Sequence, residues 1–276
     1  MFLSLESLAA LATIIGTVVG ILALIQSGTW LAVCSLLVVC LSICAVLYGR
    51  RQRLVLQAAS TVIEGYSIDS LNMANMRRKV NQTFVIQDVH HTARIEGKDL
   101  EIRWKYSGYC RAKRETAMSF SIDSDTNTSF ESLNCIAFDL GHDPEMKHQI
   151  RPLLIGAEGI SKKISVPFLE PLKANQSFGV LLKCVLPRCI TPGIGYYTST
   201  LSFSQRHVRR SEVRLIFADT PPTWLRVYES TPQKPATLVK TLVPIRQEPG
   251  HSEYVDVVEE RAGQSARVYI FLREAT

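Results

Sequence analysis

The feature that most constrains this chain is an uncharged apolar stretch near its N-terminus. Two apolar runs, Leu8–Ile25 and Trp30–Tyr48, are separated by four residues, and residues 8–48 contain no Lys, Arg, Asp or Glu. As a helix, each run reaches roughly 27 Å, close to the thickness of a bilayer's hydrocarbon core. The stretch predicts a transmembrane helical hairpin over residues 1–49. The alternative is one cleaved signal peptide, but residues 1–9 hold no cation and the second run follows at once.

The first cationic residues predict how such a hairpin is oriented. No Lys or Arg precedes Arg50, whereas Arg50, Arg51 and Arg53 follow directly after the second apolar run. Cationic flanks of a membrane span stay on the cytoplasmic side. We therefore expect a two-pass membrane protein whose N- and C-termini are both cytoplasmic.

Small residues recur on both predicted spans. Stripes of small residues let helices approach closely, either within one hairpin or between hairpins of several subunits that enclose a pore. Both arrangements remain open. The residues expected to serve packing or to line a pore are Ala12, Thr13, Gly16, Thr17, Gly20, Ser35 and Ser42.

The hydrophobic period changes to two after Thr83, which indicates strands. Leu100, Ile102, Trp104 and Tyr106 alternate with charged residues, and a Gly97-containing turn precedes them, so a hairpin is expected here. Later runs with the same character include residues 196–203, 212–217, 253–258 and 267–272, each read as a separate strand. We expect a helical connector over residues 50–80 and an all-β cytoplasmic domain over residues 81–276, a β-sandwich or open barrel of about ten to twelve strands.

Positive charge in the C-terminal part favours anionic ligands. The net charge is +6, and Glu6 is the only charged residue before Arg50, so the part after the hairpin is more basic still. One group of residues combines Arg for bidentate phosphate contacts with a Tyr for base stacking. This predicted ligand site comprises Arg103, Lys105, Tyr109, Arg111, Lys113 and Arg114. The alternative is that these are solvated turn and edge-strand charges. The ligand class stays open between a cyclic nucleotide, a short oligonucleotide, a lipid headgroup and an acidic protein.

Motifs for catalysis are weak, so we expect no enzymatic activity, no cofactor and no metal. Residues 141–148 collect His142, Asp143, Glu145 and His148, and a membrane-tethered hydrolase that uses His142, Asp143 and His148 is one alternative. An Asp-Pro turn in the segment favours an ordinary polar loop. The cysteines outside the apolar runs match no disulfide framework or zinc site, although Cys184 and Cys189 flank a Pro-containing turn and could approach each other.

The hairpin Leu8–Tyr48, the basic exit at Arg50, Arg51 and Arg53, and the strand series from Thr83 to Leu272 together resemble a known architecture. It is that of the two-transmembrane, β-rich membrane effectors of bacterial nucleotide-signalling anti-phage defence systems. The resemblance implies a homo-oligomer in the bacterial inner membrane that forms a pore or disrupts the lipid bilayer. It also implies a nucleotide or oligonucleotide second messenger and a nucleotidyltransferase partner. The alternative function is a passive membrane-anchored scaffold that recruits cytoplasmic partners through the β domain.

Overall fold

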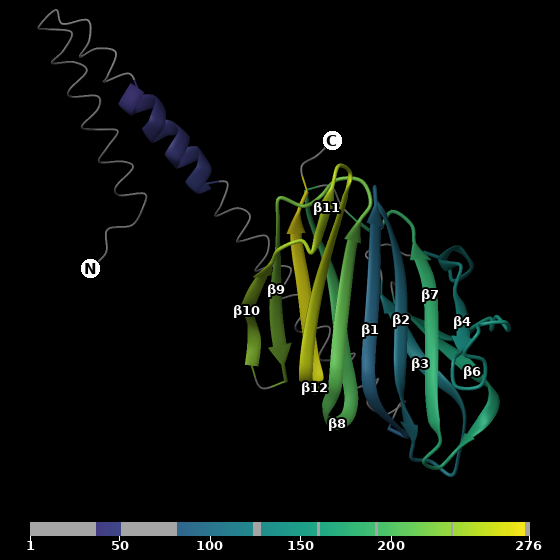
Figure 1. The fold of residues 1–276 in the computed structure, drawn as a ribbon. Helices are drawn as coiled ribbons and strands as arrows, with labels where there is room; N and C mark the ends of the chain where they lie inside the picture. Colours follow the sequence, from purple (N-terminus) through teal and green to yellow (C-terminus); the bar gives the residue numbers. More distant parts are fainter. Residues whose placement is uncertain are drawn as a thin grey trace, which may run out of the picture. The chain divides into compact units, whose positions relative to one another are not determined.

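The computed structural model describes residues 37–50, 82–123, 128–158, 161–190, 193–232 and 234–273. The chain separates into two compact units, Met1–Val62 and Ile63–Thr276. The described part of the second unit consists of strands and one short 3-10 helix (Figure 1). In chain order these are β1 (Phe84–Glu96), β2 (Asp99–Cys110), β3 (Arg114–Asp123), η1 (Glu131–Leu133), β4 (Ile136–Asp139), β5 (Leu153–Glu158), β6 (Ser161–Lys173), β7 (Ser177–Leu186), β8 (Ile194–Phe217), β9 (Trp224–Thr231), β10 (Lys234–Leu242), β11 (Arg246–Glu248) and β12 (His251–Leu272).

The first unit is described only over residues 37–50, which are helical. Among the described residues, no helix has both the length and the apolar character needed to cross a membrane. The predicted two-helix transmembrane hairpin is therefore wrong: the described part of this unit is one helix, over residues 37–50, which does not have the length and apolar character of a membrane span. The predictions of a transmembrane pore and of an inner-membrane location are corrected with it.

Most residues of the predicted hairpin lie outside the described part of the chain. The first apolar run, Leu8–Ile25, lies outside it, and so do residues 51–80 of the predicted connector. The predicted packing residues outside it are Ala12, Thr13, Gly16, Thr17, Gly20 and Ser35. Ser42 is described, and its Oγ donates a hydrogen bond to the carbonyl O of Val38 at 2.8 Å. This bond satisfies the hydroxyl within its own helix.

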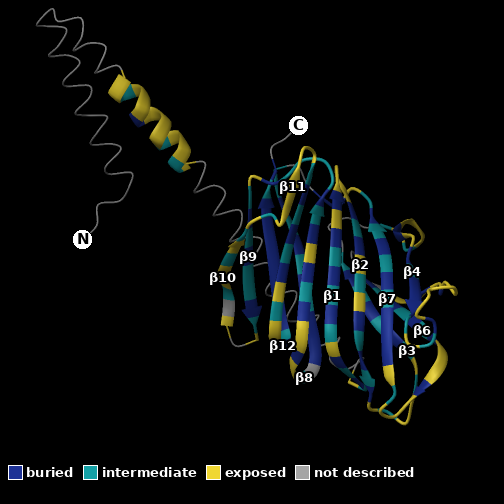
Figure 2. Ribbon diagram, in the orientation of Figure 1, coloured by how far each residue is buried: buried dark blue, intermediate teal, exposed yellow. Residues whose placement is uncertain are grey.

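The predicted hairpin after Thr83 is confirmed by β1 and β2, which pair antiparallel from Phe84–Cys110 to Glu96–Asp99. Gly97 closes the turn with a φ of 59°, a left-handed conformation that glycine adopts at low cost. Buried residues alternate with more exposed ones along the strands (Figure 2). The prediction that strands dominate the chain after Thr83 agrees with this architecture.

Two sheets form the second unit. The larger has nine strands in the order β10-β9-β12-β8-β1-β2-β7-β4, with β11 paired to β12. The smaller has the order β3-β6-β5. Neighbours pair antiparallel except β1 and β8, which run parallel from Asp88–Arg210 to Ile95–Phe217.

The long strands β8 and β12 double over, so that one sheet supplies two layers. Phe217 pairs with Ser252 in one half of this ribbon, and Phe271 pairs with Gly195 in the other half. The rings of Phe217 and Phe271 nevertheless stack edge to face, with centroids 5.0 Å apart. The two halves therefore face each other across the core, as in a β-sandwich.

The β8–β12 ribbon bends sharply near Gln205 and Gly263, and we call this bend the crease. The chain passes through the crease without a turn, so residues 196–203 and 212–217 belong to one strand instead of two. The register shifts between Ala262 and Gln264, and a Cβ at Gly263 would overlap the carbonyl of Gln205. The side chain of Gln205 bridges to β1, where its Oε1 accepts a hydrogen bond from the Ile86 backbone N–H at 2.7 Å. A bulge and side-chain hydrogen bonds thus carry the strand through the bend without a turn.

The smaller sheet completes the core beside β1, β2 and β7. Phe120 of β3 contacts Tyr106 of β2, and Phe168 of β6 contacts Phe84 of β1, with ring centroids 5.5 and 5.9 Å apart. Met118, Ile164 and the rest of this interface are buried in one continuous hydrophobic cluster. Burial of this apolar surface is the main force that holds the layers together.

Candidate functional site

The predicted anion-binding residues on β2 lie on its outer face. Arg103 and Lys105 are exposed and Tyr109 is half-buried, whereas Ile102 and Tyr106 between them are buried. Arg103 is already engaged, because its guanidinium forms an ion pair with Glu101 at 2.7 Å. These side chains share a face, as their alternation predicts.

The remaining predicted residues lie beyond the end of β2. Arg111 and Lys113 occupy the connection to β3, and Arg114 begins β3, opposite Lys173 of β6. Arg103 and Arg111 are eight residues apart, which corresponds to roughly 26 Å along a strand. The set therefore occupies two stretches, the outer face of β2 and the connection into β3, and a shared anionic ligand for them stays a prediction.

The loop over residues 141–148 contains two separate Asp–His pairs. Nδ1 of His142 lies 2.7 Å from Oδ2 of Asp139, and Nδ1 of His148 lies 3.3 Å from Oδ2 of Asp143. His142 Nε2 faces the Gln176 amide at 3.2 Å, so a hydrogen-bond donor occupies the position a catalytic base would need. No group of three or more metal-ligating side chains is found among the described residues.

Backbone donors hold both carboxylates of these pairs, Asp139 at the end of β4 and Asp143 in the loop. The buried Asp139 accepts hydrogen bonds from the backbone N–H groups of Gly141, His142 and Leu169. The His148 N–H donates to Asp143 at 2.6 Å and lowers the pKa of that carboxyl. Such contacts shape the loop and tie it to β6.

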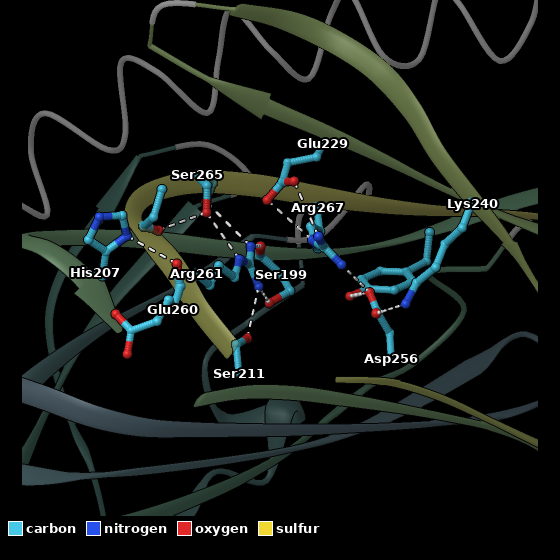
Figure 3. A network of polar contacts seen from close by, with 12 residues as sticks. Ser199, His207, Ser211, Glu229, Lys240, Asp256, Glu260, Arg261, Ser265 and Arg267 are labelled. Carbon is cyan, nitrogen blue, oxygen red and sulfur yellow. Dashed lines mark hydrogen bonds and ion pairs between the residues drawn. The ribbon is translucent and has the colours of Figure 1, made fainter. Parts of the chain in front are cut away.

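A buried polar network that the sequence patterns did not reveal lies inside the doubled ribbon (Figure 3). Asp256 of β12 is buried and contacts Lys240 Nζ at 2.6 Å, Arg267 Nη1 at 2.7 Å and Tyr269 OH at 2.9 Å. Arg267 also binds Glu229 of β9, with both contacts at 3.2 Å. The network thereby connects β9, β10 and both halves of β12.

Local charges determine the protonation states within this network. Burial raises the pKa of Asp256, but the contacts with Lys240, Arg267 and Tyr269 outweigh it and hold the pKa below its usual range. Burial lowers the pKa of Arg267, but hydrogen bonds to Glu229 and the charge of Asp256 outweigh it and raise the pKa. Burial and the Asp256 charge raise the pKa of Tyr269 well above its ordinary value. Asp256 and Arg267 are therefore ionised at neutral pH, and Tyr269 is neutral.

Arg261 fills the crease beside this network. Its guanidinium donates to Ser199 Oγ at 3.0 Å, Ser211 Oγ at 3.1 Å and Ser265 Oγ at 3.0 Å, and also to the Ser199 carbonyl. Burial lowers the pKa of this group. The guanidinium N–H groups bind serine oxygens within the ribbon, so Arg261 stabilises the fold and is not a candidate for binding an anionic ligand. The alternation in sequence gave no signal for it, because Arg261 is out of phase with the buried positions Ser252, Tyr254 and Asp256.

The outer end of the network fixes the edge strand β10. β10 pairs only with β9 on the strand path of the large sheet. Edge strands are usually protected by outward lysines. Lys240 instead turns to Asp256, and large apolar side chains are exposed along and beyond the strand. We call this the β10 edge, defined by Leu238, Val239, Val243 and Ile245.

Aromatic side chains adjoin the β10 edge on β9. Leu238 pairs with Tyr228, and Trp224 lies at the start of β9 with the guanidinium of Arg226 4.8 Å from its ring centroid. Exposed apolar surface next to half-buried aromatic rings is typical of protein interaction sites. The edge strand β5 also exposes large apolar residues, Leu153, Leu154 and Ile155, but the β10 edge differs from it in the adjoining aromatic rings of β9 and in the ion pair of Lys240 with Asp256.

Comparisons with known proteins add little to this geometry. No protein-family model matches the chain, and no curated protein matches it. Solved structures that resemble it include the M1 zinc metallopeptidase from Deinococcus radiodurans, at 11% identity and a TM-score of 0.39. A mutant of that enzyme bound to a Tyr-Ser-Ala substrate gives 12% identity and a TM-score of 0.40. Each match covers 68% of this chain and 42% of the other chain, so this chain spans less than half of those proteins. A TM-score of this size carries no argument about activity.

Proposed function

We propose that the β unit is an interaction module that recruits a partner protein by pairing an extended, apolar segment of it with the β10 edge. One observation carries the proposal: the edge strand β10 and the three residues after it expose four large apolar side chains within eight positions, 238–245. An added strand would gain backbone hydrogen bonds from the edge and side-chain contacts from alternate apolar residues.

The network behind β10 supports this proposal because it holds the edge in place before a partner arrives. Lys240 is bound to Asp256, which is bound in turn to Arg267 and Tyr269. A pre-ordered edge loses less conformational entropy on binding than a mobile one. The same ion pair draws a lysine away from the edge that would otherwise discourage pairing.

Of the predictions that the resemblance to defence-system effectors implied, those on ligand, partner and assembly remain. Regulation by a nucleotide, a nucleotidyltransferase partner and homo-oligomerisation stay predictions. For a nucleotide, the outer-face group of Arg103 and Lys105 is the better candidate, because both side chains are exposed on one strand face. The scaffold function continues here as recruitment of a partner protein.

The test is selection of extended peptides against the full chain from a displayed random library, followed by hydrogen exchange of the complexes. We expect peptides with alternating apolar residues, and slower amide exchange within residues 236–243 when they bind. The variant Leu238→Asp with Val243→Asp changes side chains that are 53% and 76% exposed. It should weaken binding at least about tenfold, or about 1.4 kcal/mol, and leave the fold intact.

A matched control is provided by the other edge strand with exposed apolar residues. Leu153→Asp with Ile155→Asp on β5 changes side chains that are 59% and 52% exposed. This variant should bind the selected peptides as the unchanged chain does. Equal loss in both variants would mean nonspecific apolar adsorption, and protection at β5 with none at β10 would refute the proposal.

A further inference from the structure

Two buried cysteines from distant parts of the chain meet beside β4. The Sγ atoms of Cys135 and Cys184 lie 2.8 Å apart, although 49 positions separate the residues in sequence. Cys135 is 8% exposed and Cys184 is 1% exposed. Proximity in sequence suggested Cys189 as the partner of Cys184, but the sulfur that lies against Cys184 is that of Cys135.

The strand register explains why these thiols meet. Ile136 of β4 pairs antiparallel with Lys183 of β7, so the preceding Cys135 stands across from Cys184. Opposite residues of an antiparallel pair have Cα atoms about 4.5 to 5.5 Å apart, within the range of about 4.4 to 6.8 Å found for disulfides. The backbone therefore already has the spacing that a cross-link needs.

We propose that Cys135 and Cys184 form a disulfide that cross-links β4, at the edge of the large sheet, to β7. The oxidant is a small-molecule disulfide such as oxidised glutathione. One cysteine thiolate attacks it, forms a mixed disulfide and releases one glutathione thiolate. The second cysteine thiolate attacks the protein sulfur of the mixed disulfide and releases the second glutathione. Two thiol protons are lost from the protein, which is oxidised by two electrons while the glutathione disulfide is reduced.

The surroundings of the pair determine when this exchange occurs. The contact with Cys135 and burial raise the pKa of the Cys184 thiol far above its ordinary value. The reactive thiolate is therefore scarce in the folded chain, and both sulfurs are shielded from solvent. Closure takes place during folding or when the four-residue strand β4 opens, and the completed bond then resists soluble reductants.

The cross-link is tested on the full chain, refolded from denaturant in a buffer of oxidised and reduced glutathione. We expect a mass loss of two hydrogen atoms, a peptide pair that links Cys135 to Cys184, and blockage of both residues to alkylation under denaturing conditions. The oxidised chain should melt about 5 to 10 °C above the chain refolded with reductant, because the bond closes a long loop.

Variants separate this pair from the other thiols. Cys110→Ser and Cys189→Ser should retain the mass loss and the melting difference, whereas Cys135→Ser and Cys184→Ser should lose both. Full alkylation of Cys135 and Cys184 in the unchanged chain after oxidative refolding would overturn the proposal. A disulfide from Cys184 to Cys189 would overturn it as well. The mass loss and the alkylation pattern are measured on the unchanged chain, so they test the proposal even if a serine variant fails to fold.

Discussion

Replacing Asp256 with Asn tests the buried network with little change of shape. The substitution removes the negative charge that faces Lys240, Arg267 and Tyr269 at 2.6 to 2.9 Å. Loss of one partner from a buried ion pair costs about 3 to 5 kcal/mol, because the other charge stays buried. Arg267 keeps Glu229, and Lys240 reaches solvent with 40% of its side chain exposed, so we expect the lower end, about 3 kcal/mol.

The measurement is urea unfolding followed by far-UV circular dichroism. In a thermal melt of the same two proteins, a loss of about 3 kcal/mol corresponds to a fall in melting temperature of about 6 to 12 °C for a domain of this size. The matched control is Glu101→Gln, which removes the exposed ion pair with Arg103 and should cost no more than about 0.5 kcal/mol. If Asp256→Asn costs less than about 1 kcal/mol, the network does not hold the ribbon as we argue.

The same residue predicts how stability depends on pH. The folded pKa of Asp256 is lowered, whereas an unfolded Asp titrates near about 3.9. The unfolded chain therefore binds the proton more readily, and the contribution of Asp256 is present above about pH 4 and is lost as pH falls through the folded pKa. Asp256→Asn should flatten this part of the curve. An unchanged acid limb in the variant would assign acid unfolding to other carboxylates.

Two further substitutions test the crease and the 141–148 loop. Gly263→Ala places a methyl group against the Gln205 carbonyl and should cost about 3 kcal/mol or more, measured by thermal unfolding, whereas Gly156→Ala, whose nearest contact is 3.9 Å away, should be nearly neutral. Equal effects of the two would contradict the close crossing. Asp139→Asn loses a buried charge that accepts backbone hydrogen bonds and the His142 contact, and should lower stability by about 2 to 3 kcal/mol with faster hydrogen exchange in residues 140–148. Unchanged exchange there would mean that the loop is held by other contacts.

The fold was predictable where it depends on neighbours in sequence. Alternation and a glycine turn were enough for the β1–β2 hairpin, because side-chain period and turn chemistry are local properties. They failed at β8, where residues 204–211 are polar apart from Val208 and therefore predicted a break between two strands. The apolar runs near the N-terminus predicted membrane spans from composition alone, whereas no helix among the described residues has the length and apolar character of a span.

The sequence by itself determined which segments are strands and where their apolar faces lie, and it listed the ionisable residues without pairing them. Only the tertiary structure decided that Asp256 faces Arg267 and that Cys135 meets Cys184. It also left the β10 edge open. The physical reason is that these pairings follow from the doubling of the ribbon and from strand register. Both are set by burial summed over the whole core, which no local sequence pattern encodes.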